Sequence, residues 1–365
     1  MKKNLLGVLD IGDLSLKYMA LENKTPFRVL EAGMEEIDIF ALHKAGSTLT
    51  NVVKQKGFTG IPIVISFPSG ICRAKVCRVE FHRQTKGVID AQEEHRMQRH
   101  MTEIASGELR EHLSKQMDIM QEDFTELRMI PLRFYLNGYE VSCLSGKNGE
   151  TAEADFLGIF LLNSHMPLFR KMREMIGESR FFVSHEAEAL HVFAKKEQKG
   201  RIVIDVGEYS CSIAVTSPLG LVQIGFVGEG GSAITHALEQ EFGLRENTAR
   251  ELKLRYMQRD ISEEARSRVQ TIVVPHVRRL VGLLKKELET MDISLPPVVS
   301  LVGGDALLPE IREELEERGG FDGLPLAGES VVASILTPKD LGISTTFPRK
   351  LDPIFTPPIL LSHAK

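Results

Sequence analysis

The sequence predicts an α/β protein of two domains with mixed sheets, into which a separate α+β subdomain is inserted. At 365 residues the chain is too long for a single compact core. Two segments of the same design, Leu6–Glu22 and Arg201–Thr216, each contain an apolar β-branched run, an Asp-x-Gly turn and a second alternating strand. A third segment, Pro297–Leu315, is typical of a buried strand, a Gly303-Gly304 turn and a helix. These three segments, in this order and spacing, carry the prediction.

The first part of the chain, residues 5 to about 81, is predicted to form strands with one short helix. The apolar run Ile61–Ile65, followed by the turn residues Ser66–Gly70, indicates a buried strand that closes in a turn. The composition then becomes highly charged from Asp90 to Met120. Within that stretch, apolar residues recur at helical spacing, which predicts a helix: Ile104, Leu109, Leu113 and Met117.

Strands are predicted to complete the insert. Met129–Leu136 and Glu140–Leu144 flank Asn137-Gly138, a strong hairpin signal, and Asp155–Leu162 supplies a third strand. Two helices follow in the prediction, at Met166–Ile176 and Ser184–Lys195.

The second domain is predicted to start at Arg201 and to run to about Phe347. Its long amphipathic helix, Ile272–Thr290, carries one apolar stripe, made of Val277, Leu280, Val281, Leu284 and Leu288. The last stretch, Pro348–Lys365, contains four prolines and is predicted to be an extended tail. Three of those prolines lie within Pro353–Lys365, so we expect no amphipathic membrane helix there.

Composition narrows the class of protein. A net charge of −5 gives no general attraction for nucleic acid or anionic lipid. The four cysteines form no CxxC pair and show no metal-ligand spacing, which favours a reduced, cytoplasmic protein. No apolar run approaches the roughly 18–20 residues that span a bilayer, and a strand at the N-terminus leaves no signal peptide before the fold.

The two Asp-x-Gly hairpins suggest a phosphate site. Each turn presents backbone N–H groups, and each has one carboxylate at its base, Asp10 in the first and Asp205 in the second. Two such hairpins facing each other would clamp a phosphate chain, and the aspartates would hold a cation such as Mg²⁺. Gly303 and Gly304 would let the backbone approach a flat ligand closely.

These motifs resemble the actin-like (ribonuclease H-like) ATPase superfamily, and within it the FtsA/PilM branch. Asp10-Ile-Gly12 with Ser15 and Lys17 resembles the first phosphate loop of the family, and Asp205-Val-Gly207 with Ser210 resembles the second. Gly303-Gly304 is similar to the adenosine motif. Gly228–Tyr256 resembles the stretch of glycines and helix that ends in Ala-Glu-x-x-Lys, and Leu127–Val141 resembles a strand pair of the inserted subdomain of this branch.

The resemblance implies a domain plan and a binding site for ATP and Mg²⁺. The plan is a first actin-like domain at 1–81 and 165–200, an inserted α+β subdomain at 82–164, a second actin-like domain at 201–347 and a proline-containing tail at 348–365. The metal would lie near Asp10 and Asp205. The implied nucleotide contacts are Asp10, Gly12, Ser15, Lys17, Asp205, Gly207, Ser210, Gly230, Gly231, Lys253, Gly303 and Gly304.

Three departures from the family pattern argue for weak or absent ATP binding. Asp13 stands where the family has Thr or Ser, Glu208 stands where it has Gly, and Arg250 replaces an acid. Two carboxylates beside a triphosphate would repel it, by several kcal/mol if they are desolvated. Glu208 also removes a glycine from a turn that could require positive φ. We expect at most a weak ATPase with no identifiable catalytic residue, and Glu208 as a solvated turn residue.

The eleven histidines do not cluster, and no HExxH motif is present. His185, near Glu186 and Glu188, is given no functional role. A metal site among the histidines is therefore not predicted.

The resemblance implies a cytoplasmic, FtsA-like scaffold in bacterial cell division, attached to the inner membrane through a partner. It would associate with itself, or with a cytoskeletal or membrane-anchored protein, through the inserted subdomain. It would bind no nucleic acid and insert directly into no membrane. A PilM-like scaffold of type IV pilus assembly is the alternative, and a small-molecule kinase on the same fold is a second alternative.

Overall fold

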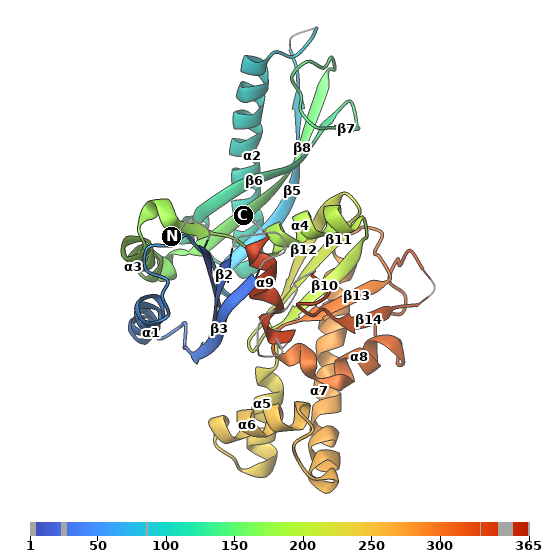
Figure 1. Ribbon diagram of the computed structural model, residues 1–365. Coiled ribbons are helices and arrows are strands. Elements are labelled where there is room, and N and C mark those ends of the chain that lie inside the picture. The colour runs from blue at the N-terminus through green and yellow to red at the C-terminus, as the bar shows by residue number, and fades with distance from the viewer. Residues whose placement is uncertain (1–4, 23–27, 85–86, 329, 342–352, 364–365) are drawn as a thin grey trace. The chain divides into compact units, whose positions relative to one another are not determined.

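The computed structural model describes residues 5–22, 28–84, 87–328, 330–341 and 353–363. The chain divides into two compact units. The main unit consists of Met1–Gly70 with Met175–Lys365, and the insert unit is Ile71–Glu174 (Figure 1). Each unit is built around sheets of its own.

The first sheet of the main unit has the order β3-β2-β1-β4-β9. Its strands β1 and β2 are antiparallel and form the first Asp-x-Gly hairpin, whereas β4 and β9 continue the sheet in parallel. The strands are β1 (Leu5–Ile11), β2 (Ser15–Glu22), β3 (Arg28–Glu36), β4 (Ile63–Ser66) and β9 (Phe181–Val183).

The second sheet of the main unit repeats this plan in the order β12-β11-β10-β13-β14. Strands β10 and β11 form the second hairpin, and β13 and β14 add in parallel. Asp10 faces Lys17 and Ser66 across its neighbouring strands, and Asp205 occupies the equivalent position in the second hairpin. The strands are β10 (Arg201–Val206), β11 (Cys211–Ser217), β12 (Gly220–Val227), β13 (Val298–Val302) and β14 (Val332–Ile335).

The helices of the main unit pack on these sheets. α4 contacts β11 and β12, and α9 contacts α4 together with β1, β2 and β4. α7 contacts β12 and α8, and α8 contacts β14. The helices are α1 (Leu42–Gln55), α3 (Met166–Ile176, which crosses the unit boundary), α4 (Glu186–Glu197), α5 (Ser232–Phe242), α6 (Glu246–Met257), α7 (Glu263–Glu289), α8 (Pro309–Glu316) and α9 (Thr356–Ser362).

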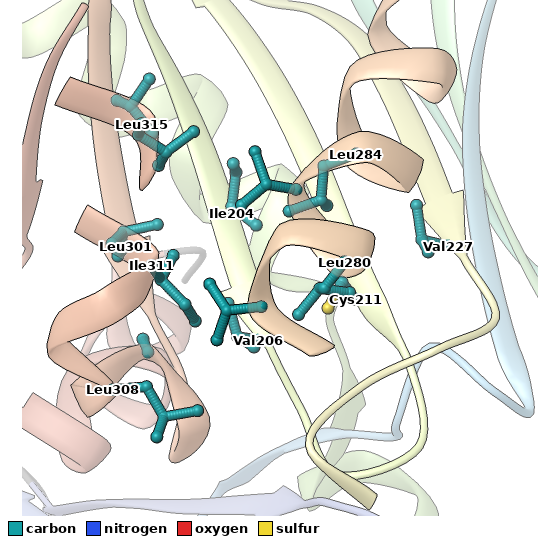
Figure 2. Packing of buried hydrophobic residues seen from close by; sticks show 14 of the residues in the cluster. Ile204, Val206, Cys211, Val227, Leu280, Leu284, Leu301, Leu308, Ile311 and Leu315 are labelled. Atoms are coloured by element: carbon teal, nitrogen blue, oxygen red, sulfur yellow. The ribbon is translucent and has the colours of Figure 1, made fainter. Parts of the chain in front are cut away.

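The core beside the second sheet is aliphatic. Side chains of β10 and β13 meet the apolar stripe of α7 and the inner face of α8 (Figure 2). All five residues of the predicted α7 stripe are buried. The helix starts nine residues earlier than predicted, because the Ser262 side chain accepts a hydrogen bond from the N–H of Ala265 and caps its N-terminus.

The insert unit has a four-stranded antiparallel sheet in the order β5-β8-β6-β7. The predicted insert began at residue 82, but β5 lies before that residue and pairs with β8 along its whole length. The strands are β5 (Cys72–His82), β6 (Phe124–Leu136), β7 (Tyr139–Val141) and β8 (Thr151–Leu162).

One long helix, α2 (Ala91–Met117), packs along this sheet (Figure 1). Asp90 caps it by accepting a hydrogen bond from the N–H of Glu93 at 2.7 Å. The buried stripe recurs every fourth residue and consists of Met97, Met101, Ala105, Leu109 and Leu113. These side chains give the insert unit an apolar core of its own.

The C-terminal segment differs from the prediction. The expectation of an extended tail is wrong for residues 353–363, where the 3₁₀ turn η5 (Pro353–Phe355) leads into α9; the rest of the predicted tail lies outside the described residues. Pro357 and Pro358 lie in the first turn of α9, where a missing N–H costs no helical hydrogen bond. All seven residues of α9 are buried, and the Thr356 hydroxyl donates to the carbonyl of Leu336 at 2.7 Å.

Within the described parts of the chain, no helix is both long enough and apolar enough to span a bilayer.

Candidate functional site

The main unit contains a cavity of about 760 Å³ at the turns of the two hairpins. The turn after β4, the start of α4, the helix α6, the turn after β13 and the C-terminal segment also line it. Nine carboxylate and three cationic side chains line this cavity, so its charge is strongly acidic unless protons or cations neutralise it. Its aliphatic wall includes Met34, Leu254, Met257, Ile354 and Leu361.

The first hairpin holds its aspartate by two strong contacts. One carboxylate oxygen of Asp10 lies 3.1 Å from Lys17 Nζ, and the other accepts a hydrogen bond from the hydroxyl of Ser66 at 2.6 Å. Burial acts to lower the pKa of Lys17, but the charges of Asp10 and Asp205 outweigh it and raise that pKa above its ordinary value. The charge of Lys17 is therefore already balanced by a carboxylate of the protein.

The turn glycines use their N–H groups within the turns. The N–H of Gly12 donates to the carbonyl of Ser15 at 2.8 Å, and the N–H of Gly207 donates to the carbonyl of Ser210 at 3.0 Å. Each bond closes its own hairpin. Two of the predicted nucleotide contacts, Gly12 and Gly207, thus already use their N–H groups inside the protein.

Asp13 links the first hairpin to the second. Its Oδ2 atom accepts a hydrogen bond from the backbone N–H of Tyr209 at 3.3 Å, across 196 positions of sequence. Its Oδ1 atom is buried and has no hydrogen-bond partner among the described residues. Burial raises the pKa of Asp13, and the nearby charge of Glu208 adds to this effect. A carboxylate of the protein thus lies where the second turn could receive an anion.

The Glu208 carboxylate contacts side chains of α5 and α6, so the expectation of a solvated turn residue is wrong. Its Oε2 atom lies 2.9 Å from Lys253 Nζ, and its Oε1 atom accepts from the hydroxyl of Thr235 at 3.3 Å. Glu208 is also absent from the residues with positive φ within the described chain, so its position does not require glycine. The carboxylate is held because a buried lysine lies within reach of this turn.

Lys253 joins three segments. Its ammonium contacts Glu208, lies 2.8 Å from Asp305 Oδ1 and donates to the carbonyl of Gly231 at 3.1 Å. The side chain of Lys253 is 3% exposed, and the two carboxylates raise its pKa although burial acts in the opposite direction. Burial raises the pKa of Asp305 to about 6, against the opposing effect of Lys253. All three ammonium protons therefore have acceptors in the protein.

The predicted glycines Gly230 and Gly231 lie behind the second turn. The N–H of Gly231 donates to the carbonyl of Gly207, and the N–H of Ser232 donates to the carbonyl of Glu208. A Cβ atom on Gly230 would lie 2.3 Å from the carbonyl oxygen of Gly207. These glycines allow close packing of two loops, and they are not among the residues that line the cavity.

Gly303 is needed for both its conformation and its lack of a side chain. Its φ is +94°, and a Cβ atom there would lie 2.1 Å from Asp205 Oδ1. Gly304 has an ordinary φ of −67°, and a Cβ atom there would meet nothing within 4 Å. The Gly-Gly turn therefore contributes its first glycine to the packing around Asp205 and leaves the second facing open space.

His185 and Glu186 belong to the site, although the sequence had given them no role. His185 caps α4 by accepting from the N–H of Ala187 at 3.2 Å, and burial lowers its pKa to about 4. Glu186 accepts a hydrogen bond from the hydroxyl of Ser212, and burial raises its pKa to about 8. Burial likewise raises the pKa of Asp205 to about 6. The available signal was a short apolar run, Phe181–Val183, that lies two residues before a helix N-terminus.

A divalent metal at Asp10 and Asp205 does not fit this arrangement. Both oxygens of Asp10 are engaged by Lys17 and Ser66, so a metal would have to displace them. Among the described residues, no group of three or more His, Cys, Asp or Glu side chains is arranged to hold a metal ion.

A magnesium nucleotide does not fit the cavity either. The turn N–H groups of Gly12 and Gly207 are bonded internally, and both lysines that line the cavity are paired with carboxylates. The structure does bring ten of the twelve predicted contacts to the cavity wall, namely Asp10, Gly12, Ser15, Lys17, Asp205, Gly207, Ser210, Lys253, Gly303 and Gly304. The predicted contacts therefore lie together, but their side chains give the cavity a surplus of carboxylates over cations.

No protein-family model and no curated protein matches the sequence. Solved structures do match the fold. One is the PilM–PilN type IV pilus biogenesis complex, with a TM-score of 0.67 and 15% identity, covering 98% of this chain and 97% of that chain. Another is the ethanolamine utilization protein EutJ from Carboxydothermus hydrogenoformans, with a TM-score of 0.51 and 11% identity, covering 99% of this chain and 89% of that chain. The chain therefore has the actin-like ATPase fold, with two ribonuclease H-like sheets and an additional antiparallel sheet.

Proposed function

We propose that this chain is a PilM-type scaffold of a type IV pilus assembly machine, cytoplasmic and attached to the inner membrane through a protein partner. The observation that carries the proposal is the likeness to the PilM–PilN structure, which extends over 98% of this chain. The main unit alone could not reach that coverage, so the likeness includes the insert unit. The partner of that protein is named in its complex, and we infer a partner of the same kind here.

The insert unit is the surface that we assign to partner contact or self-association. It has its own sheet and its own apolar core, built from α2 and the strands β5, β6 and β8. Because the unit has its own core, its surface residues can change without destabilising the main unit. Such a surface can therefore be adapted to bind a partner protein.

The cell-division alternative depends on the motif resemblance to FtsA, which belongs to the same branch. A division scaffold and a pilus scaffold differ in the phenotype of a deletion. Loss of a pilus scaffold abolishes surface pili and leaves cell length unchanged, whereas loss of a division scaffold gives filamentous cells.

The kinase alternative needs a phosphate donor in the cavity. Nine acidic and three cationic side chains line that cavity, so its net charge stays negative even with Glu186 protonated and opposes a donor of high negative charge. A phosphorylation assay across small polyols and acids, with ATP as donor, should give no turnover. Turnover would favour the kinase over the scaffold.

The proposal is tested by capture of a pilus partner. The cytoplasmic segment of each inner-membrane pilus protein of the same organism is immobilised and challenged with two forms of this protein. One is the full chain, and the other has Ile71–Glu174 replaced by a short flexible linker. We expect the full chain to be retained by one segment and the deleted form to be lost while its main unit stays folded by circular dichroism. Equal retention of both forms would exclude the insert unit as the contact, and a deletion strain with normal pili would contradict the function.

A further inference from the structure

We infer that carboxylates of the protein itself prevent nucleotide binding in this cavity: Asp13 bridges the two hairpin turns, and Glu208 and Asp305 occupy the lysine that lines the cavity beside them. We call these three side chains, with Lys253 and the backbone N–H of Tyr209, the carboxylate latch. This inference goes beyond the scaffold function and does not depend on which partner the scaffold holds.

The first half of the latch crosses between the hairpins. Asp13 follows the first turn glycine, and its carboxylate accepts from the N–H of Tyr209, which lies in the second turn. The ring of Tyr209 also contacts that of Phe40, with centroids 6.1 Å apart. The residue next to Phe40, Ile39, is fixed beside the first turn because its N–H donates to the carbonyl of Asp13 at 3.1 Å. Backbone, carboxylate and aromatic contacts thus converge on one point.

The second half of the latch joins the turn of the second hairpin to α6 and to the turn after β13. Lys253 on α6 holds Glu208 of the second turn and Asp305 of the 3₁₀ turn η4 (Asp305–Leu307). The two distances, 2.9 and 2.8 Å, are those of charge-assisted hydrogen bonds. One ammonium group thus joins three segments that line the cavity.

The charge at these positions would repel a triphosphate. At an effective dielectric constant of about 20, two unit charges about 4 Å apart repel by about 4 kcal/mol. None of the three cations that line the cavity can offset this without leaving its own carboxylates, because Lys17 is paired with Asp10 and Lys253 with the latch. The third, Arg250, is paired with Glu246 and lies 3.8 Å from Glu208. Removal of the latch carboxylates would both lower the repulsion and release a lysine.

A latch of this kind joins the two hairpin turns without any nucleotide. A ligand that does not bind cannot shift a conformational equilibrium. The scaffold would therefore hold one conformation whatever the nucleotide supply of the cell, in contrast to an ATPase that changes shape on hydrolysis.

The experiment is a calorimetric titration of Mg-ATP into three proteins. The first is the unmodified chain, and the second carries Asp13→Thr, Glu208→Gly and Asp305→Ser, which remove the latch. The third carries Glu35→Gln, Glu36→Gln and Glu251→Gln, which remove three exposed carboxylates from the wall of the same cavity. The third protein matches the second in charge and leaves the latch intact.

We expect no measurable binding by the unmodified chain at millimolar Mg-ATP and at least a tenfold gain in affinity in the latch variant. The charge-matched control should gain less than threefold. If the triple variant does not fold, the single variant Asp13→Thr replaces it and Glu36→Gln alone becomes its charge-matched control, with an expected gain of about threefold in the first and none in the second. Micromolar affinity in the unmodified chain, or equal gains in the latch variant and the control, would overturn the inference.

Discussion

The two Asp-x-Gly hairpins have the same backbone arrangement, but the acids that follow their turn glycines contact different partners. In the first, Asp10 is neutralised locally by Lys17 and accepts a hydrogen bond from Ser66, and the next acid, Asp13, reaches the other hairpin. In the second, the acid that follows the glycine is Glu208, and it pairs with Lys253 on α6. The pairing of strands fixes the position of a turn, whereas the long-range partner of each carboxylate decides what the turn can bind.

The hairpins also differ in what supports them. The first packs against α9, a short helix from the end of the chain. The second packs against α7 and α8 through a broad aliphatic core (Figure 2). Four substitutions test how much each of these contacts contributes to the stability of the protein.

The largest expected effect is that of Lys253→Met. It leaves the buried Asp305 without its cation and removes from the half-buried Glu208 the closer of its two cations, which we expect to lower the free energy of unfolding by about 4 kcal/mol. Urea denaturation measures this change. The control is Lys286→Met on the exposed face of α7, with an expected change within about 0.5 kcal/mol. Similar values for the two variants would mean that the second hairpin does not depend on its clamp.

Support of the first hairpin by α9 is tested by Leu360→Ala. The side chain is fully buried, so its truncation should cost about 3 kcal/mol in urea denaturation. Leu219→Ala removes the same atoms from a side chain that is 50% exposed and should cost less than about 1 kcal/mol. If Leu360→Ala were as mild as its control, α9 would be a loosely attached tail, as the sequence had suggested.

The Gly-Gly turn offers a matched pair on the second hairpin. Gly303→Ala places a methyl group against Asp205 and requires positive φ, so we expect a loss of about 2 kcal/mol in stability. Gly304→Ala meets open space at an ordinary φ and should be neutral within about 0.5 kcal/mol. Thermal unfolding of both variants checks the order. The reverse order would place the close approach at the wrong glycine.

The smallest effect concerns Glu186, which lies near both hairpins. Its pKa of about 8 means that the folded protein holds a proton that the unfolded chain has lost above its ordinary value of 4.5. Stability therefore falls as the pH rises through this window, because the folded state binds more protons. Raising the pH from 6.5 to 8.5 should lower the melting temperature by a few degrees. Glu186→Gln should flatten this slope, and an unchanged slope would assign it to other groups.

Local sequence patterns were sufficient to predict the hairpins, the strand before Gly303 and the α7 stripe. Each of these is encoded in a short run of residues whose period or turn chemistry is visible in the sequence. The placement of Asp13 against Tyr209 was beyond such reasoning, because 196 residues separate the two partners. Glu208 was misjudged for the same reason, since its lysine lies 45 positions away. The tail was misjudged because prolines in a first helical turn were taken as helix breakers.

Hydrogen exchange at the Tyr209 amide, followed by NMR, reports whether Asp13 joins the two hairpins in solution. We expect this amide to be protected in the unmodified protein without nucleotide and unaffected by Mg-ATP, because Asp13 accepts its hydrogen bond. In Asp13→Ala it should exchange at least tenfold faster, while the Gly207 amide, bonded within its own turn to Ser210, keeps its protection. An unchanged rate at Tyr209 in the variant, or protection that appears only when Mg-ATP is added, would contradict the account.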